Sequence, residues 1–135
     1  TKVWAKGETI RLNFPMEIQL LASNPLVRED AGRVTVKRGP VVYCMEEVDN
    51  GKNLHLTKIC VNGAKTAEAV DEMGEHFVRV SAEGRRVKMG DAEKQPLYHL
   101  YQKDEEENTE LKLIPYYMWN NRGEGEMQVW IRACE

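Results

Sequence analysis

The sequence predicts an all-β protein, an antiparallel β-sandwich of the jelly-roll type with at most one short helical turn. Many short segments alternate apolar and polar side chains, which is the period of a half-buried strand. Turn-forming residues separate these segments at intervals of about ten residues, and no long stretch repeats at the helical period of about 3.6. Short strands with frequent turns are typical of sandwiches and barrels.

The first expected strand, residues 9–16, shows the alternation clearly. Its apolar side chains share one face: Ile10, Leu12, Phe14 and Met16. Because Pro15 cannot donate a backbone N–H, this strand should lie at a sheet edge or end there. The other expected strands are residues 17–21, 33–37, 41–46, 52–56, 76–82, 86–89, 97–101, 110–115 and 126–132.

Turn formers mark the boundaries between these strands, and they lie at residues 24–25, 31–32, 38–40, 49–51, 62–63, 83–84, 90–91 and 120–125. Residues 66–73 are the only moderately helical window, and we expect one turn at most before Gly74 ends it. In the strand at 41–46 we expect Val42 and Tyr43 to be core residues and Cys44 to be buried.

Length and charge limit the classes of protein and partner. The 135 residues, 41% of them hydrophobic, fit one domain with a real core. A net charge of -3 offers no basic excess for nucleic acid or anionic membrane. No apolar run approaches the roughly 20 residues that span a bilayer. The first residues show neither an initiator Met nor the layout of a signal peptide, so we take the chain as part of a longer protein whose localisation its ends do not give.

The three cysteines give no sign of a metal centre. Cys44, Cys60 and Cys134 are an odd number, widely separated, and none belongs to a CxxC pair. The spacing therefore indicates neither a disulfide framework nor a zinc site, and we expect inert thiols and no metal or cofactor in this chain.

A search for a reaction centre finds none. Neither of the glycine-rich spacings that hold nucleotide phosphates occurs in the chain. Glu46 and Glu47 are the best-placed pair of carboxylates, but neighbours on a strand point to opposite faces and cannot share a substrate. We therefore predict no catalytic residue.

The densest aromatic patch lies near the end of the chain. Rings, amides and a cation follow one another there: Tyr116, Tyr117, Trp119, Asn120, Asn121 and Arg122. Three interpretations stay open, namely a core followed by a polar turn, an interface with another domain, and a carbohydrate contact in which rings stack on sugars.

Four segments carry a family resemblance. Residues 113–130, LIPYYMWNNRGEGEMQVW, form the most specific of them, and residues 33–46, RVTVKRGPVVYCME, form a strand-turn-strand block. Residues 4–16 begin Trp-Ala-Lys-Gly-Glu and end Pro-Met, with Glu8 where Asp is usual, and residues 24–27 read Asn-Pro-Leu-Val. In their order along the chain, these segments resemble glycoside hydrolase family 127, the beta-L-arabinofuranosidase family.

The resemblance implies a place in a larger enzyme. Members of that family have an N-terminal catalytic (α/α)6 barrel followed by β-sandwich domains, and this chain resembles the C-terminal sandwich. Their zinc-bound cysteine nucleophile lies before this portion, so no catalytic or metal residue carries over. The implied role is non-catalytic support of the barrel, with a carbohydrate-binding module as the alternative.

The resemblance also implies partners and boundaries. The expected partners are the catalytic barrel, the preceding β-sandwich and, as a homodimer, a second copy. We treat residues 1–135 as one domain and residues 1–22 as a candidate end of the preceding sandwich. A soluble protein of the bacterial cytoplasm or periplasm is compatible with the family.

Overall fold

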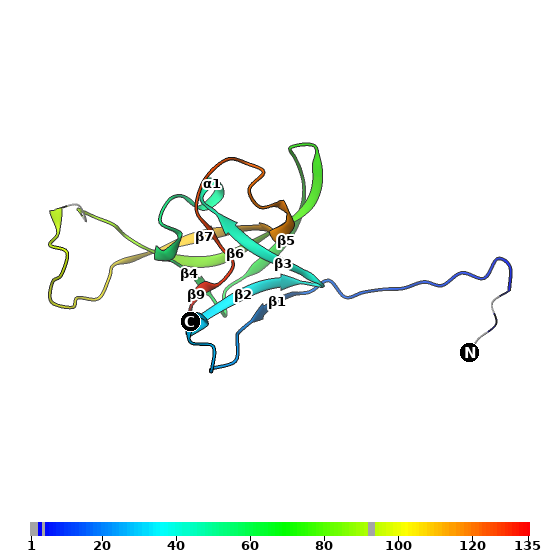
Figure 1. The fold of residues 1–135 in the computed structure, drawn as a ribbon, viewed down its shortest axis with the longest axis horizontal. Coiled ribbons are helices and arrows are strands. Elements are labelled where there is room, and N and C mark those ends of the chain that lie inside the picture. The colour runs from blue at the N-terminus through cyan, green and yellow to red at the C-terminus, as the bar shows by residue number, and fades with distance from the viewer. Residues whose placement is uncertain (1–2, 4, 92–93) are drawn as a thin grey trace.

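The computed structural model describes residue 3, residues 5–91 and residues 94–135, and it is all-β with a few short helical turns (Figure 1). The strands are β1 (Ile18–Leu21), β2 (Arg33–Arg38), β3 (Val41–Glu46), β4 (Thr57–Cys60), β5 (Lys65–Glu72), β6 (Glu75–Val87), β7 (Glu106–Pro115), β8 (Met127–Gln128) and β9 (Ile131–Cys134). The helical turns are α1 (Glu47–Asn50) and the 3-10 turns η1 (Arg28–Asp30), η2 (Leu54–Leu56) and η4 (Tyr116–Met118). No helix in the described part of the chain has the length and apolar character that crossing a bilayer requires.

Six strands close into a barrel, so the predicted antiparallel sandwich needs correction. Pairing runs from β2 through β9, β4, β6, β7 and β3, and it returns to β2. The strands β1, β5 and β8 pair with β2, β6 and β3 outside this ring. One pair, β4 with β9, is parallel. Alternating polarity could not distinguish these folds, because strands of a sandwich and of a barrel both bury one face.

The buried side chains form two groups on opposite sides of the barrel wall. The larger cluster consists of Val36, Tyr43, Met45, Leu54, Ile59, Val80, Ala82, Leu111, Leu113 and Ile131. The smaller contains Cys44, Phe77, Ile114 and Met118. Alternation along β3 sends Tyr43 to the first and Cys44 to the second, and both are buried as the sequence predicts. Val42 is 38% exposed, which corrects its assignment to the core.

The expected helical turn at residues 66–73 is a strand instead. β5 pairs with β6 along its whole length, and the hairpin closes through Met73 and Gly74. Both turn residues have positive φ, 55° and 78° respectively, which suits the tight turns that match strand twist. Cross-strand pairing here outweighs the weak helical propensity of the segment.

β6 continues through residues 83–84, where the sequence predicts a turn. A Cβ on Gly84 would lie 2.5 Å from the carbonyl oxygen of Lys58 and 2.9 Å from Cγ of Leu111. This glycine therefore lets β4 and a core side chain approach the strand, which is a role of glycine within sheets.

Three other expected strands are absent. Residues 52–56 contain η2, and the strand β4 begins only at Thr57. Residues 9–16 and 97–101 form no strand, and their large apolar side chains are exposed. We call residues 5–16 the arm and residues 88–91 with 94–105 the β6–β7 loop. They leave the barrel in different directions (Figure 1).

Candidate functional site

The aromatic patch predicted from the sequence is a turn fixed to the outside of the barrel. β7 ends at Pro115, and η4 follows at once. Met118 of η4 is buried against Cys44, Phe77 and Ile114. Met118 thus anchors the turn to the barrel, while the adjacent rings of Tyr117 and Trp119 face solvent. We call residues 116–125 the aromatic turn.

Three rings of the aromatic turn reach solvent. Tyr116, Tyr117 and Trp119 are 46%, 66% and 41% exposed. The rings of Tyr116 and Trp119 stack with centroids 6.0 Å apart and planes inclined by 21°. This exposure excludes the interpretation of the rings as core, and it leaves a domain interface and a sugar contact open.

Arg122 lies inside the protein rather than beside the rings. Its side chain is only 6% exposed. Nη2 lies 2.5 Å from a carboxylate oxygen of Glu46 and 2.5 Å from one of Asp49, and Nη1 lies 3.4 Å from Glu72. Nε donates a further hydrogen bond of 3.0 Å to Glu46. The cation thus ties the aromatic turn to β3, α1 and β5, and little of it remains for a ligand.

The electrostatics of this cluster favour a permanently charged guanidinium. Burial lowers the pKa of Arg122. The hydrogen bonds and charges of Asp49 and Glu46 together raise it by more, so the net pKa lies above the ordinary value. Nearby, burial and the charge of Glu46 raise the pKa of the Cys44 thiol to about 12. Cys44 is therefore an inert buried thiol at physiological pH.

The two asparagines of the predicted set take different positions. The backbone N–H of Asn120 donates to Glu46 Oε1 at 3.0 Å, and Asn120 has a φ of 65°. The Asn121 amide donates to the Met118 carbonyl at 3.2 Å. The structure therefore brings the six predicted residues into one turn. The rings and both asparagines are exposed, and only the Arg122 side chain is buried, as a polar anchor of the turn.

The sequence did not identify the carboxylates that hold this anchor. Glu46, Asp49 and Glu72 are more than 45 residues from Arg122 along the chain, and no local pattern links them. Glu47 points elsewhere, and its Oε2 accepts a hydrogen bond of 3.0 Å from the Glu126 N–H. The two neighbouring glutamates thus serve different contacts. Glu46 ends β3 but Glu47 begins α1, so the predicted alternation along a strand does not extend to Glu47.

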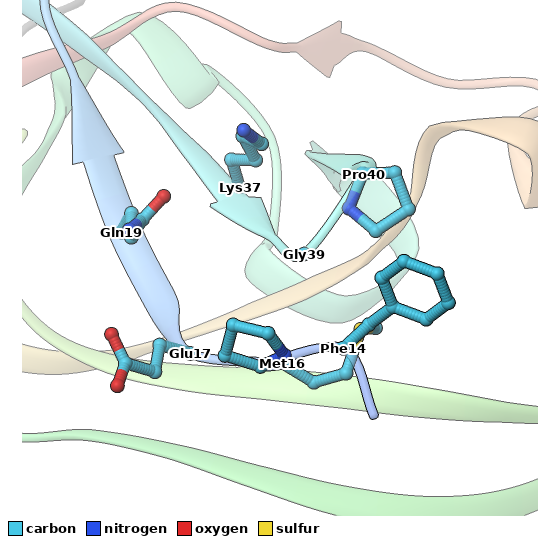
Figure 2. A pocket seen from close by; sticks show the side chains of 8 residues that line it. Phe14, Met16, Glu17, Gln19, Lys37, Gly39 and Pro40 are labelled. Atoms are coloured by element: carbon cyan, nitrogen blue, oxygen red, sulfur yellow. The ribbon is translucent and has the colours of Figure 1, made fainter. Parts of the chain in front are cut away.

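A second feature is an apolar hollow at the base of the arm. It measures about 600 Å³ and lies between residues 14–17 and the turn that joins β2 to β3. Figure 2 shows Phe14 and Met16 beside Gly39 and Pro40 of that turn. A Cβ on Gly39 would lie 2.3 Å from Met16 Sδ, so the methionine packs where the glycine leaves room.

Histidine, cysteine and acidic side chains are the usual metal ligands. Among the described residues, no three His, Cys, Asp or Glu side chains are grouped so that they could hold a metal ion. The expectation that this chain has no metal or cofactor therefore stays a prediction.

Comparisons with known proteins extend the observations on the fold. The glycoside hydrolase family 127 C-terminal domain matches residues 18–132. A non-reducing end beta-L-arabinofuranosidase of Bifidobacterium longum subsp. longum is 38% identical over 93% of this chain. The match covers 20% of that relative, so the chain spans about a fifth of its length.

Solved structures give the same result. The GH127 beta-L-arabinofuranosidase from Geobacillus stearothermophilus T6 superposes with a TM-score of 0.83 and 37% identity, over 90% of this chain and 19% of that one. A second GH127 beta-arabinofuranosidase gives a TM-score of 0.73 and 32% identity, over 88% of this chain and 17% of the other. The family match over most of the chain, the identity to the relative and the shared fold confirm the resemblance. The matched range begins at residue 18 and does not include the first motif, whose Trp4 lies outside the described residues. The chain belongs to the family of glycoside hydrolase family 127 C-terminal domains.

Proposed function

We propose that this chain is a non-catalytic domain of a beta-L-arabinofuranosidase-like glycoside hydrolase, and that it supports the catalytic barrel by docking against neighbouring domains. The observation that carries the proposal is the arm. Its alternating apolar side chains are exposed, with Leu12 at 72% and Phe14 at 70%, although the rest of the chain buries a complete core.

The arm has the chemistry of a strand that lacks its sheet. Apolar side chains at alternate positions require a pleated surface to cover them. No strand among the described residues pairs with residues 9–16. The preceding β-domain of the full-length protein is the partner that this pattern fits, because a strand next in the chain reaches it first.

The β6–β7 loop supplies a second contact surface. Leu97, Tyr98, Leu100 and Tyr101 are all at least 87% exposed. Clustered apolar side chains on a projecting loop are typical of an interaction surface. We assign this surface to the catalytic barrel of the same protein or to a second copy of it, and the homodimer remains part of the proposal.

Carbohydrate binding is the alternative function. The exposed Tyr116 and Trp119 rings favour it, since aromatic faces can stack on sugars. Arg122 weakens it, because the guanidinium that would hydrogen-bond sugar hydroxyls is bound by three carboxylates. We therefore rank docking first.

A matched pair of variants tests docking in the full-length enzyme. The double substitution Leu12→Ser and Phe14→Ser removes apolar area from the arm, whereas Arg11→Ser with Asn13→Ser alters the other face. If the arm docks, the first pair lowers the thermal midpoint of the full-length enzyme by several degrees, because each apolar side chain buried contributes about 1.5–3 kcal/mol. The control pair has little effect, and the isolated chain tolerates both pairs. Equal midpoints for both pairs in the full-length enzyme would contradict docking through the arm.

A titration tests the alternative. The isolated chain is titrated with arabinose-containing oligosaccharides, as wild type, as Trp119→Ala and as Tyr101→Ala, a ring outside the aromatic turn. We expect no saturable binding and no hydrolysis of aryl arabinofuranosides. Saturable binding that Trp119→Ala abolishes and Tyr101→Ala retains would favour the carbohydrate-binding module over the docking domain.

A further inference from the structure

Two cysteines that are distant in sequence meet where the barrel closes. Cys60 ends β4, Cys134 ends β9, and they are direct partners in the single parallel pair among the described strands. Their Sγ atoms lie 3.4 Å apart although 74 positions separate them in the sequence. Both thiols are free and only partly buried.

Strand geometry places this pair within reach of a covalent bond. Neighbouring strands lie roughly 4.7–4.9 Å apart, and disulfides join residues whose Cα atoms are about 4.4–6.8 Å apart. The two sulfur atoms must approach from 3.4 Å to the bonded distance of about 2.05 Å. Rotation about the two Cα–Cβ bonds moves the sulfur atoms in this direction.

We propose that Cys60 and Cys134 form a reversible disulfide on exposure to a low-molecular-weight disulfide such as oxidised glutathione. One cysteine thiolate attacks a sulfur of the oxidant, and the first glutathione thiolate leaves. The second cysteine thiolate then attacks the protein sulfur of the mixed disulfide and expels the second glutathione. The pair loses two electrons and two protons in total, and these yield two molecules of reduced glutathione.

The surroundings distinguish this pair from the third cysteine. Cys44 is fully buried, so an oxidant cannot reach it. Burial and the hydrogen bond between the two thiols raise the pKa of Cys134 to about 11, while Arg85 opposes this and Glu106 adds to it. Cys134 is therefore mostly protonated at neutral pH, and oxidation is slow there without a catalyst.

The bond would act on the last strand of the barrel. β9 has only four residues, and two hydrogen bonds secure its end: the Val61 N–H donates to the Cys134 carbonyl at 2.8 Å, and the Ala133 N–H donates to the Gly32 carbonyl at 2.9 Å. A covalent link closes a long loop between β4 and β9, and such links stabilise a fold by restricting the unfolded chain. Oxidation would thus hold the barrel closed at its parallel seam.

The test follows the 135-residue chain during incubation with oxidised glutathione under native conditions. We expect two of the three thiols to disappear, the mass to fall by two hydrogen atoms, and peptide mapping to find Cys60 linked to Cys134. The thermal midpoint should rise by at least about 5 °C and return after reduction with dithiothreitol. The bond should form at a rate that does not depend on protein concentration.

Single substitutions complete the test. Cys44→Ser should retain the linked peptide, whereas Cys60→Ser and Cys134→Ser should each lose it and the rise in midpoint. If a variant fails to fold, the peptide map of the wild-type chain still shows whether Cys60 and Cys134 are linked. Three persistent thiols, stable glutathione adducts without a bridge, or bonds between chains would each overturn the proposal.

Discussion

Arg122 determines how the aromatic turn is held. A buried guanidinium gains stability from carboxylates only when its geometry satisfies them, and here it contacts Glu46, Asp49 and Glu72 at once. Glu46 also accepts the Asn120 N–H, so one carboxylate holds both Asn120 and Arg122 of the aromatic turn. The exposed rings are therefore presented by a rigid base rather than by a free loop.

Removal of this cation should be costly. Arg122→Met keeps most of the side-chain length but leaves Glu46 and Asp49 buried without a counter-charge, so we expect a loss of about 3–5 kcal/mol in the free energy of unfolding. Arg132→Met, at an exposed position of β9, is the control and should cost less than about 0.5 kcal/mol. Chemical denaturation measures both. Similar midpoints would show that the cluster does not hold the turn.

Neighbouring positions on β3 give a second contrast. Tyr43 is 1% exposed, and its hydroxyl donates to the Val78 carbonyl at 3.0 Å, whereas Val42 faces outward. Tyr43→Ala should therefore lower the free energy of unfolding by about 3–5 kcal/mol, and Val42→Ala by less than about 1 kcal/mol. Denaturation with urea ranks the two, and a larger loss for Val42→Ala would contradict the orientation of this strand.

The segment that follows the aromatic turn is secured through one carboxylate. Glu126 accepts the N–H groups of Asn53 and Leu54 at 3.0 Å and 2.7 Å, and so fixes the start of η2. These backbone hydrogen bonds lower the pKa of Glu126 below its usual 4.5. The link joins two segments that the sequence places far apart.

This lowered pKa predicts a dependence of stability on pH. The folded chain binds the Glu126 proton less well than the unfolded chain, so its contribution is complete above about pH 4.5 and is lost as the pH falls through the lower folded pKa. Glu126→Gln should remove part of the acid sensitivity, while Glu124→Gln, exposed in the same loop, should retain it. Thermal midpoints from pH 3 to pH 7, which span about 4.5, measure this. Parallel profiles for wild type and Glu126→Gln would contradict the assignment.

Local sequence patterns predict the strands that bury one face. They do not predict features that depend on contacts between residues distant in the sequence. Residues 33–37 and 41–46 were predicted well, because alternation and the glycine turn between them are local signals. The long strand β6 was divided at Gly84, since the approach of β4 that requires this glycine is not visible in sequence. The aromatic turn was found from its composition, but its anchor was not, because Glu46 and Arg122 are 76 residues apart.

The molecule as a whole is a closed barrel that exposes apolar side chains on two projections. The arm and the β6–β7 loop leave different sides of the barrel (Figure 1). Apart from Met16, which packs beside Gly39, none of their apolar side chains belongs to the buried core of the barrel. The proposed docking against other domains of a longer protein would account for both projections.

Hydrogen–deuterium exchange, compared between the isolated chain and the full-length enzyme that we propose contains it, tests this docking. Amides of residues 9–16 and 97–101 should exchange rapidly in the isolated chain, because neither segment belongs to a strand there. In the full-length enzyme both segments should be strongly protected, while β6 and β7 are protected in both samples. Rapid exchange of the arm and the loop in the full-length enzyme would contradict a docking role for this domain.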